Sequence, residues 1–257
     1  MLKEDLRFKD SLVFEGMTSI RAILRSIDEG ISDRRIETIL YDEDRMKKIQ
    51  KEVGYLRAVS EKYGFQIIAS NAEKIALHTI GNSHGGIIAI TSARTIPPLT
   101  EDAALPHRGF YVMIQGIEDP YNFGYSLRSL YACGCDGIVL PERNWMSAAG
   151  VVARSSAGAS ELFPIYTADA LDAARIFKSN GYTVACADEN TDLILGKCEL
   201  KLPIFLIVGG EKRGISASLM EMSDMIVKIP YAREFKASLS AASATTMLAY
   251  EIARQNF

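Results

Sequence analysis

Two uninterrupted apolar segments, Phe110–Ile114 and Ile204–Val208, limit the possible folds of this chain more than any other feature. A strand with one face in water alternates apolar and polar side chains, and neither segment does so. Strands that are apolar on both sides are typical of a parallel sheet covered by helices. Both segments are far too short to cross a bilayer, which takes about 20 apolar residues. They therefore predict an α/β domain built around a parallel sheet.

Helix-like and strand-like segments alternate from Phe110 to the end of the chain, as expected for such a sheet. The predicted strands span 110–115, Gly137–Leu140, 163–166, Thr183–Ala187, Ile204–Val208 and 225–229. The predicted helices span 123–133, a segment after Ser147, 168–179, 216–222 and 238–255. Ligands bind at the carboxyl ends of the strands in sheets of this kind, so the loops there are the first candidates for a site.

A smaller α/β unit precedes this region. Apolar residues at helical spacing predict helices at Gly16–Asp28, 43–62 and Ala72–His78, and short β-rich runs predict strands at 36–41, 65–69 and Ile87–Thr91. Three prolines, Pro97, Pro98 and Pro106, can continue neither a helix nor a central strand and mark a linker. We therefore divide the chain into an N-terminal domain (1–94), a linker (95–108) and a C-terminal domain (109–257).

The net charge of −3 does not by itself favour a nucleic-acid partner. Residues 1–94 hold 15 Lys and Arg against 14 Asp and Glu, whereas residues 95–257 hold 14 against 18. The N-terminal domain is thus the less acidic part, with basic pairs at Arg34-Arg35 and Lys47-Lys48. Solvated helix faces produce the same pattern, so charge alone leaves the partner open.

The sequence also bears on location and metal binding. The first ten residues alternate charges and lack the apolar core of a secretory signal, so we expect a cytoplasmic protein without a membrane segment. The four cysteines form no C-x-x-C pair, and the three histidines lack ligand spacing. This pattern favours reduced, mostly buried thiols over a metal site.

Three loops at predicted strand ends carry residues suited to binding. In the first, Asp119 and Asn122 suit a turn and a helix cap, Gly124 permits close backbone approach, and Arg128 lies two turns into the following helix. An ordinary capped turn with a surface arginine has the same sequence. This loop alone therefore does not indicate a function.

The second loop contains Gly209, Gly210 and Glu211, directly after the strand Ile204–Val208. Paired glycines leave backbone N–H and C=O groups accessible to an adenosine-like ligand. The loop matches neither G-x-G-x-x-G nor G-x-x-x-x-G-K-[ST], which disfavours a nicotinamide enzyme or a nucleotide-triphosphate cradle. A glycine-rich connector remains the alternative.

The third loop runs from Ile229 and Pro230 to Ser238, Leu239 and Ser240, before a helix rich in small residues. Pro230 ends the strand, and we expect Ser238 to cap the helix. Taken alone, this segment predicts only a closely packed helix.

In this order and spacing, the three loops resemble the motifs of the SpoU/TrmH branch of the SPOUT RNA methyltransferases: D-P-x-N-x-G-x-x-x-R, G-[N/G]-E-x-x-G and I-P followed by S-L-N. The resemblance covers 109–257, and the segment Arg154-Ser155-Ser156-Ala157-Gly158-Ala159 is similar to a Ser-x-Gly-Ala stretch of that family. Residues 1–94 resemble the small α/β/α domain, similar to certain ribosomal proteins, that often precedes the catalytic domain and helps to bind RNA. One departure there is His84-Gly85-Gly86, where relatives commonly have His-Gln-Gly.

The resemblance implies a C-terminal parallel sheet whose last segment threads a deep trefoil knot, an exception to the rule that chains do not thread loops. It implies that S-adenosylmethionine binds in the knot and that the chain forms homodimers with the last helix in the interface. The cofactor-binding residues carried over by motif position are Gly209, Gly210, Ile229, Pro230 and Leu239.

For catalysis, the resemblance implies Asn122, Arg128, Glu211, Ser238 and Ser240. A guanidinium is a poor free base, so we expect Arg128 to anchor an RNA phosphate and lower the pKa of the 2′-hydroxyl. We expect Glu211 to order the motif loops. Ser240 departs from the family pattern, which has Asn there, and a single short hydroxyl replaces an amide donor and acceptor.

Two functions from different classes follow. The first is an S-adenosylmethionine-dependent enzyme that methylates a ribose 2′-hydroxyl in RNA, with rRNA favoured over tRNA because of the separate N-terminal domain. The alternative is an RNA-binding protein of the same fold with weak or no catalysis, suggested by Ser240 and by the acidic C-terminal domain.

Overall fold

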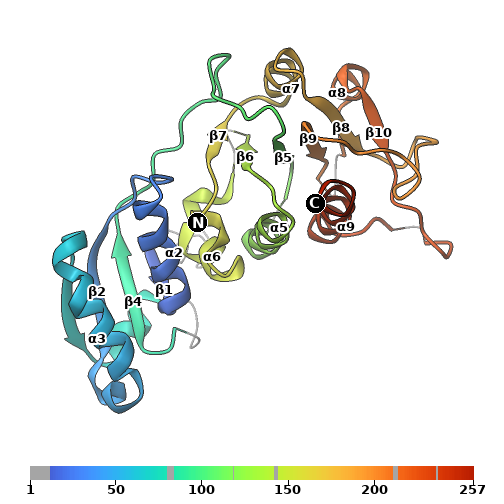
Figure 1. Ribbon diagram of the computed structural model, residues 1–257. Helices are drawn as coiled ribbons and strands as arrows, with labels where there is room; N and C mark the ends of the chain where they lie inside the picture. Colours follow the sequence, from blue (N-terminus) through green and yellow to red (C-terminus); the bar gives the residue numbers. More distant parts are fainter. Residues whose placement is uncertain (1–11, 80–83, 118, 142–143, 211–213, 236) are drawn as a thin grey trace, which may run out of the picture. The chain divides into compact units, whose positions relative to one another are not determined.

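The computed structural model describes residues 12–79, 84–117, 119–141, 144–210, 214–235 and 237–257 (Figure 1). The chain forms two compact units. Unit 1 consists of the residues up to Thr95 together with Trp145–Leu162, and unit 2 consists of Ile96–Asn144 together with Phe163–Phe257. The predicted linker at 95–108 accounts for one crossing between units, but the separate placement of Trp145–Leu162 was not expected from the sequence.

Unit 1 is built on a four-stranded sheet of order β1-β4-β2-β3. Its strands are β1 (Val13–Glu15), β2 (Ile36–Asp42), β3 (Gln66–Ser70) and β4 (Ile87–Thr91). Strands β2 and β3 are parallel, and the other two pairs are antiparallel. The helices are α2 (Gly16–Asp28), α3 (Met46–Tyr63) and α4 (Ala72–His78), with a 3-10 turn, η1 (Glu43–Arg45), before α3.

Helix α6 (Ala149–Ser155) and the 3-10 turns η2 (Trp145–Ala148) and η3 (Ala159–Glu161) complete unit 1. Ala149 and Ala153 of α6 belong to the same buried apolar cluster as Phe14 of β1. Arg34 donates a hydrogen bond from Nε to the Glu161 carboxylate at 2.8 Å, and both side chains are fully or almost fully buried. Apolar packing and a buried ion pair therefore join this late segment to the N-terminal sheet.

Unit 2 contains six strands in the order β10-β8-β9-β5-β6-β7, and every neighbouring pair is parallel. The strands are β5 (Phe110–Ile114), β6 (Gly137–Leu140), β7 (Ile165–Thr167), β8 (Thr183–Ala187), β9 (Ile204–Val208) and β10 (Met225–Val227). The helices are α5 (Pro120–Ala132), α7 (Ala170–Ser179), α8 (Ala217–Met222) and α9 (Ala241–Asn256). The α/β fold with a parallel sheet is confirmed.

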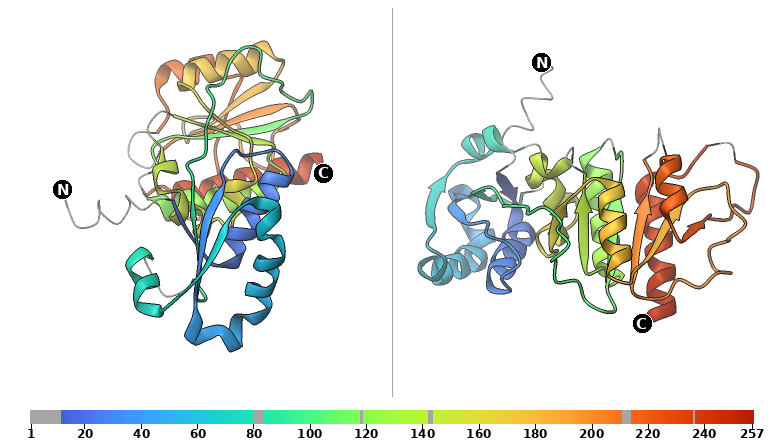
Figure 2. Two further views of the ribbon diagram at one scale, coloured as in Figure 1. Left: turned by 90° about the vertical axis from the view of Figure 1, so that its left-hand side faces the viewer. Right: turned by 90° about the horizontal axis from the view of Figure 1, so that it is seen from above.

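Helices cover both faces of this sheet: α7 and α8 lie on one side, α5 and α9 on the other (Figures 1 and 2). Every residue of β5, β6 and β9 is buried, because alternate side chains enter the two cores. On the α7 side, the Phe177 ring stacks on Phe205 with 4.1 Å between ring centroids. The two apolar segments are thus uninterrupted because helices cover both faces of the sheet, as inferred from the sequence.

The predicted elements differ from the observed ones mainly at their ends. Strand β1 was not predicted, because its three residues follow a charged stretch and carry little pattern of their own. Helix α9 begins at Ala241, and its cap is Ser240, whose Oγ accepts a hydrogen bond from the Ser243 N–H at 3.2 Å. The prediction of Ser238 as the cap was wrong, since Ser238 lies two residues before the cap.

No helix in the described ranges is long and apolar enough to span a membrane. Nor do the described residues contain a group of three or more His, Cys, Asp or Glu side chains that could hold a metal ion.

Candidate active site

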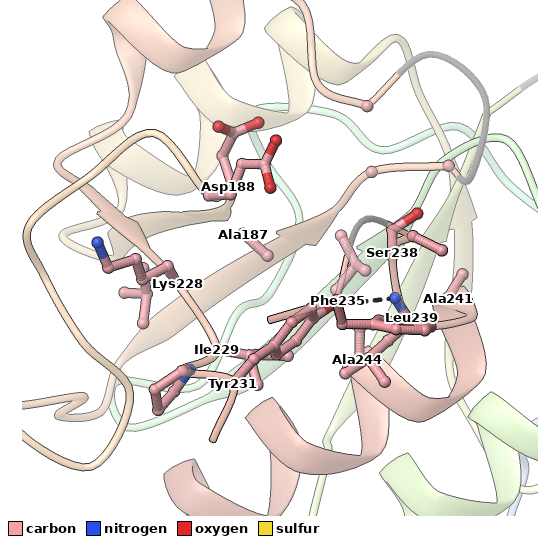
Figure 3. A pocket seen from close by; sticks show the side chains of 18 residues that line it. Ala187, Asp188, Lys228, Ile229, Tyr231, Phe235, Ser238, Leu239, Ala241 and Ala244 are labelled. Carbon is pink, nitrogen blue, oxygen red and sulfur yellow. Dashed lines mark hydrogen bonds between the residues drawn. The ribbon is translucent and has the colours of Figure 1, made fainter. Parts of the chain in front are cut away.

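A cavity of about 650 Å³ lies in unit 2, where strands β8, β9 and β10 end (Figure 3). Four stretches of chain line it: the residues after β8, the glycine loop after β9, the segment after β10, and the approach to α9 with the first turns of that helix. These stretches are far apart in sequence. The parallel sheet brings them together because its strands all end at the same edge.

All five residues predicted to bind a cofactor line this cavity. They are Gly209, Gly210, Ile229, Pro230 and Leu239. Of the five residues predicted to act in catalysis, Ser238 lines the cavity, and Asn122, Arg128 and Ser240 do not. Glu211 lies outside the described residues.

The glycine loop packs too closely for side chains. A Cβ on Gly210 would lie 2.7 Å from the Gly116 Cα and O atoms, and a Cβ on Gly209 would lie 2.7 Å from the Gly214 carbonyl carbon. These neighbours are backbone atoms, which cannot move aside as a flexible side chain can. Glycine therefore lets the loop after β9 pack against the loop after β5 and exposes backbone to the cavity.

An apolar wall on one side comes from the segment before α9. The Tyr231 hydroxyl accepts a hydrogen bond from the Leu239 N–H at 3.1 Å, which ties the start of this segment to its end (Figure 3). The rings of Tyr231 and Phe235 lie 6.1 Å apart. Ile229 and Ala244 complete the wall.

Polar groups at the end of β8 were missed in the sequence analysis. Asp188 and Glu189 both line the cavity. The Asp188 carboxylate accepts hydrogen bonds from the backbone and side-chain N–H groups of Asn190, each at 2.9 Å, so one of its oxygens has a fixed position. Asp188 and Glu189 directly follow the predicted strand Thr183–Ala187, and this position was the available signal for a binding role. An acidic residue at a strand end is also a common turn residue, so the signal was not specific.

The first predicted loop leads into α5. Asp119 caps this helix by accepting a hydrogen bond from the Asn122 N–H at 3.0 Å, as predicted for a turn residue. Arg128 is exposed, and no hydrogen bond or ion pair of its guanidinium is recorded among the described residues. Within the described residues, therefore, no partner takes up its charge.

The sequence profile of the SpoU rRNA Methylase family matches residues 109–250, which is more than half of the chain. The chain belongs to this family. The match begins just before β5 and ends within α9, so it includes all the cavity-lining segments.

Bacterial proteins assigned to the TrmH family of tRNA/rRNA methyltransferases resemble this SpoU family member over the same region. One, from Staphylococcus saprophyticus, is 28% identical over 145 residues, and another, from Staphylococcus aureus, is 32% identical over 148 residues. Each alignment covers 56% of this chain and 58% of the relative. The chain thus matches less than two thirds of the length of these relatives.

Solved structures match nearly the whole chain. An AdoMet-bound rRNA methyltransferase from Sinorhizobium meliloti has a TM-score of 0.78 at 23% identity, covering 98% of this chain and 93% of its own. The SpoU methyltransferase AviRb from Streptomyces viridochromogenes, in complex with AdoMet, has a TM-score of 0.76 at 19% identity, covering 99% and 98%. At these identities the likeness establishes a shared SPOUT methyltransferase fold. The trefoil knot within it remains a prediction for this chain.

Proposed function

We propose that this chain is an S-adenosylmethionine-dependent methyltransferase that acts on a ribose 2′-hydroxyl of RNA, with rRNA favoured over tRNA. The observation that carries the proposal is the cavity at the ends of β8, β9 and β10, because all five residues expected to contact the cofactor line it. Two structural neighbours hold AdoMet, and another is an RNA 2′-O ribose methyltransferase. These descriptions of the neighbours support the assignment.

The residues of the cavity fit S-adenosylmethionine. A volume of about 650 Å³ lies within the range of small-molecule sites. Gly209 and Gly210 leave the backbone open to an adenosine, and Ile229 and Leu239 supply an apolar contact surface. The Asp188 carboxylate offers an acceptor for a hydroxyl or ammonium group. When bound, the cofactor would supply a methyl group that its sulfonium already activates.

The chain would then hold the 2′-oxygen in line and help to remove its proton. Arg128 is the residue best suited to bind the RNA phosphate, since its exposed guanidinium engages no other described group. A positive charge beside the ribose also lowers the pKa of the 2′-hydroxyl. We assign Asn122 and Ser238 to positioning the substrate, and Glu211 to ordering the loop after β9.

We further propose that unit 1 binds RNA and that the enzyme is a homodimer with α9 in the interface. Three large apolar side chains on α5 and α9 are exposed: Tyr125, Met247 and Tyr250. Met247 and Tyr250 lie three residues apart on α9 and so share one face of the helix, and apolar side chains gathered on an exposed face favour an interface.

A second candidate is an RNA-binding protein with weak or no catalysis, and the position of Ser240 favours it. The Ser240 hydroxyl caps α9 and also lies 3.0 Å from the Ser243 hydroxyl, so it is engaged in the helix start. Ser240 does not line the cavity. Ser240 therefore does not bring to the cavity the amide of the Asn that the family pattern has at this position.

Two measurements separate these functions. Calorimetry with S-adenosylmethionine should give micromolar binding for the enzyme, and absence of binding at millimolar cofactor would favour the second candidate. Mapping of 2′-O-methylation across total RNA, with and without the gene, should then reveal one site that depends on the protein. Unchanged methylation of rRNA and tRNA would contradict the proposed activity.

A further inference from the structure

A second cavity, of about 330 Å³, lies within unit 1. The start of α2, one face of α3, the residues before β4 and the end of α6 line it. All of its lining residues belong to unit 1, so the cavity is separate from the candidate active site in unit 2. Nothing in the proposed methyl transfer uses it.

Glu52 of α3 gives this cavity an unmet hydrogen-bond acceptor. The residue lines the cavity, and its Oε2 atom is buried without a hydrogen-bond partner among the described residues. A buried carboxylate oxygen without a donor is costly, because water no longer solvates it. The arrangement is explained if a ligand supplies the donor.

His84 gives the same cavity a donor. Its side chain is 8% exposed, and its Nδ1 accepts a hydrogen bond from the Gly86 N–H at 3.0 Å. Burial lowers the pKa of His84, so the ring is neutral at pH 7 and carries its proton on Nε2. No partner of Nε2 is recorded in the described part of the chain, and the residue lines the cavity.

The first turn of α2 adds backbone donors. Glu15 occupies the cap position, but its side chain makes no cap hydrogen bond. Its carboxylate instead accepts a hydrogen bond from Arg154 at 2.9 Å. The N–H groups that open α2 at this wall of the cavity therefore receive no side-chain acceptor from the cap.

The charged side chains that line the cavity argue against a phosphate or other anion. Among the lining side chains, Arg154 is paired with Glu15, His84 is neutral, and Glu52 is an acid whose Oε2 has no recorded hydrogen-bond donor in the described part of the chain. The occupant must offer N–H donors to a carboxylate and an acceptor to the donors nearby. Met17, Ile49 and Ile87 supply apolar walls that suit a flat ring.

We propose that this cavity binds a guanine base, with Glu52 accepting from the base and His84 donating to it. Guanine places two neighbouring N–H donors, N1 and N2, beside the carbonyl O6, which suits a cavity lined both by a carboxylate, Glu52, and by an N–H donor, His84. The other RNA bases do not present two such donors side by side with an acceptor. The proposal rests on the proposed function only in taking single-stranded or unpaired RNA as the source of the base.

Binding of short RNAs tests the proposal without any methyl transfer. The single-stranded pentamer UUGUU should bind at least about tenfold more tightly than UUAUU, UUCUU or UUUUU in fluorescence anisotropy. Glu52→Gln, which replaces one acceptor oxygen with a donor, should remove most of this preference. Glu61→Gln on the same helix lies outside the cavity lining and should leave the preference within about twofold.

Free guanosine distinguishes a nucleoside site from an RNA site, with adenosine as the matched ligand. In the wild-type protein, guanosine but not adenosine should shift the ring resonances of His84, a readout that does not depend on the folding of a variant. Equal affinity for all four pentamers, or a guanine preference that survives Glu52→Gln, would overturn the inference. Normal methylation without a guanine preference would overturn only this inference. A guanine preference without methylation would overturn only the proposed function.

Discussion

At the scale of single residues, the loop after β9 depends on the absence of two side chains as much as on the atoms that are present. Gly209 and Gly210 are required because backbone occupies the space that a Cβ would need. Ser240, by contrast, has a defined structural task as the cap of α9. Ser240 can thus cap α9 without supplying the amide chemistry of the Asn that the family pattern has at this position.

We expect Arg128→Ala to reduce methyl transfer by at least about a hundredfold, because an electrostatic contact to the reacting group would be lost. Transfer of labelled methyl from S-adenosylmethionine to a competent RNA measures this. Arg175→Ala is the matched control, since Arg175 is an exposed arginine on α7 that pairs locally with Asp172 at 2.6 Å. Equal activity of the two variants would exclude Arg128 from the mechanism.

We expect Gly210→Ala to weaken cofactor binding at least about tenfold and to lower the free energy of unfolding by about 1–3 kcal/mol. The new Cβ would meet the backbone of Gly116 and of Gln115, at 2.7 Å and 2.8 Å, and would force the two loops apart. Calorimetry and urea denaturation measure the two effects. Gly54→Ala is the control: its Cβ would meet nothing within 4 Å in the middle of α3, so it should leave binding unchanged and not lower stability.

At the scale of elements, α9 closes unit 2 and carries a network at its C-terminal end. Glu251 accepts hydrogen bonds from Arg254, at 2.9 and 2.7 Å, and from Gln255 at 2.8 Å. Gln255 also donates to the Cys198 carbonyl and accepts from the Leu200 N–H, which fixes the segment before β9 against the helix. Helix α9 therefore lines the cavity with its first turns and holds the segment before β9 with its C-terminal end.

This network predicts an acid sensitivity. The hydrogen bonds from Arg254 and Gln255 lower the pKa of Glu251 to about 2, from an ordinary value of 4.5. Because the folded pKa is depressed, the contribution to stability is complete above about pH 4.5 and is lost as pH falls towards 2. Urea midpoints measured between pH 6 and pH 3 should fall less steeply for Glu251→Gln than for the wild type. Glu221→Gln, on the exposed side of α8, should follow the wild-type slope.

The sequence predicted element types well where the pattern is local and strong. Strands β4, β6, β8 and β9 and helices α2 and α4 have the predicted bounds. The start of α9 was misplaced because Ser238, Ser240 and Ser243 are all competent capping residues, and only the backbone path decides among them. In the cavity, ordered motifs identified the glycines and Leu239, whereas Asp188 belongs to no motif and only the sheet places it there.

At the scale of the whole molecule, the exposed apolar side chains on α9 bear on assembly. Tyr250 is 62% exposed and Met247 is 42% exposed, three residues apart and thus on one face of the helix. If this face forms the proposed homodimer interface, sedimentation should give a dimer for the wild type. Tyr250→Lys combined with Met247→Lys should give a monomer, because burying the new charges is costly.

Leu77→Lys is the control for assembly. Leu77 lies on α4 in unit 1 and is 79% exposed, more than either residue on α9. A general effect of surface lysines would change the sedimentation of this variant too. If the α9 double variant remains a dimer, the interface lies elsewhere on the protein.

The packing of Trp145–Leu162 into unit 1 has a consequence for how such a protein can change through evolution or engineering. A gene fusion or deletion at a single point near residue 95 would remove Arg34 and Phe14 but leave Glu161, Ala149 and Ala153 behind. The remaining fragment would expose the small apolar side chains of α6, and the Glu161 carboxylate would have lost its counter-charge. The N-terminal unit is therefore not an interchangeable module: any swap must exchange two separate stretches of chain together, or redesign the surface of α6 and η3.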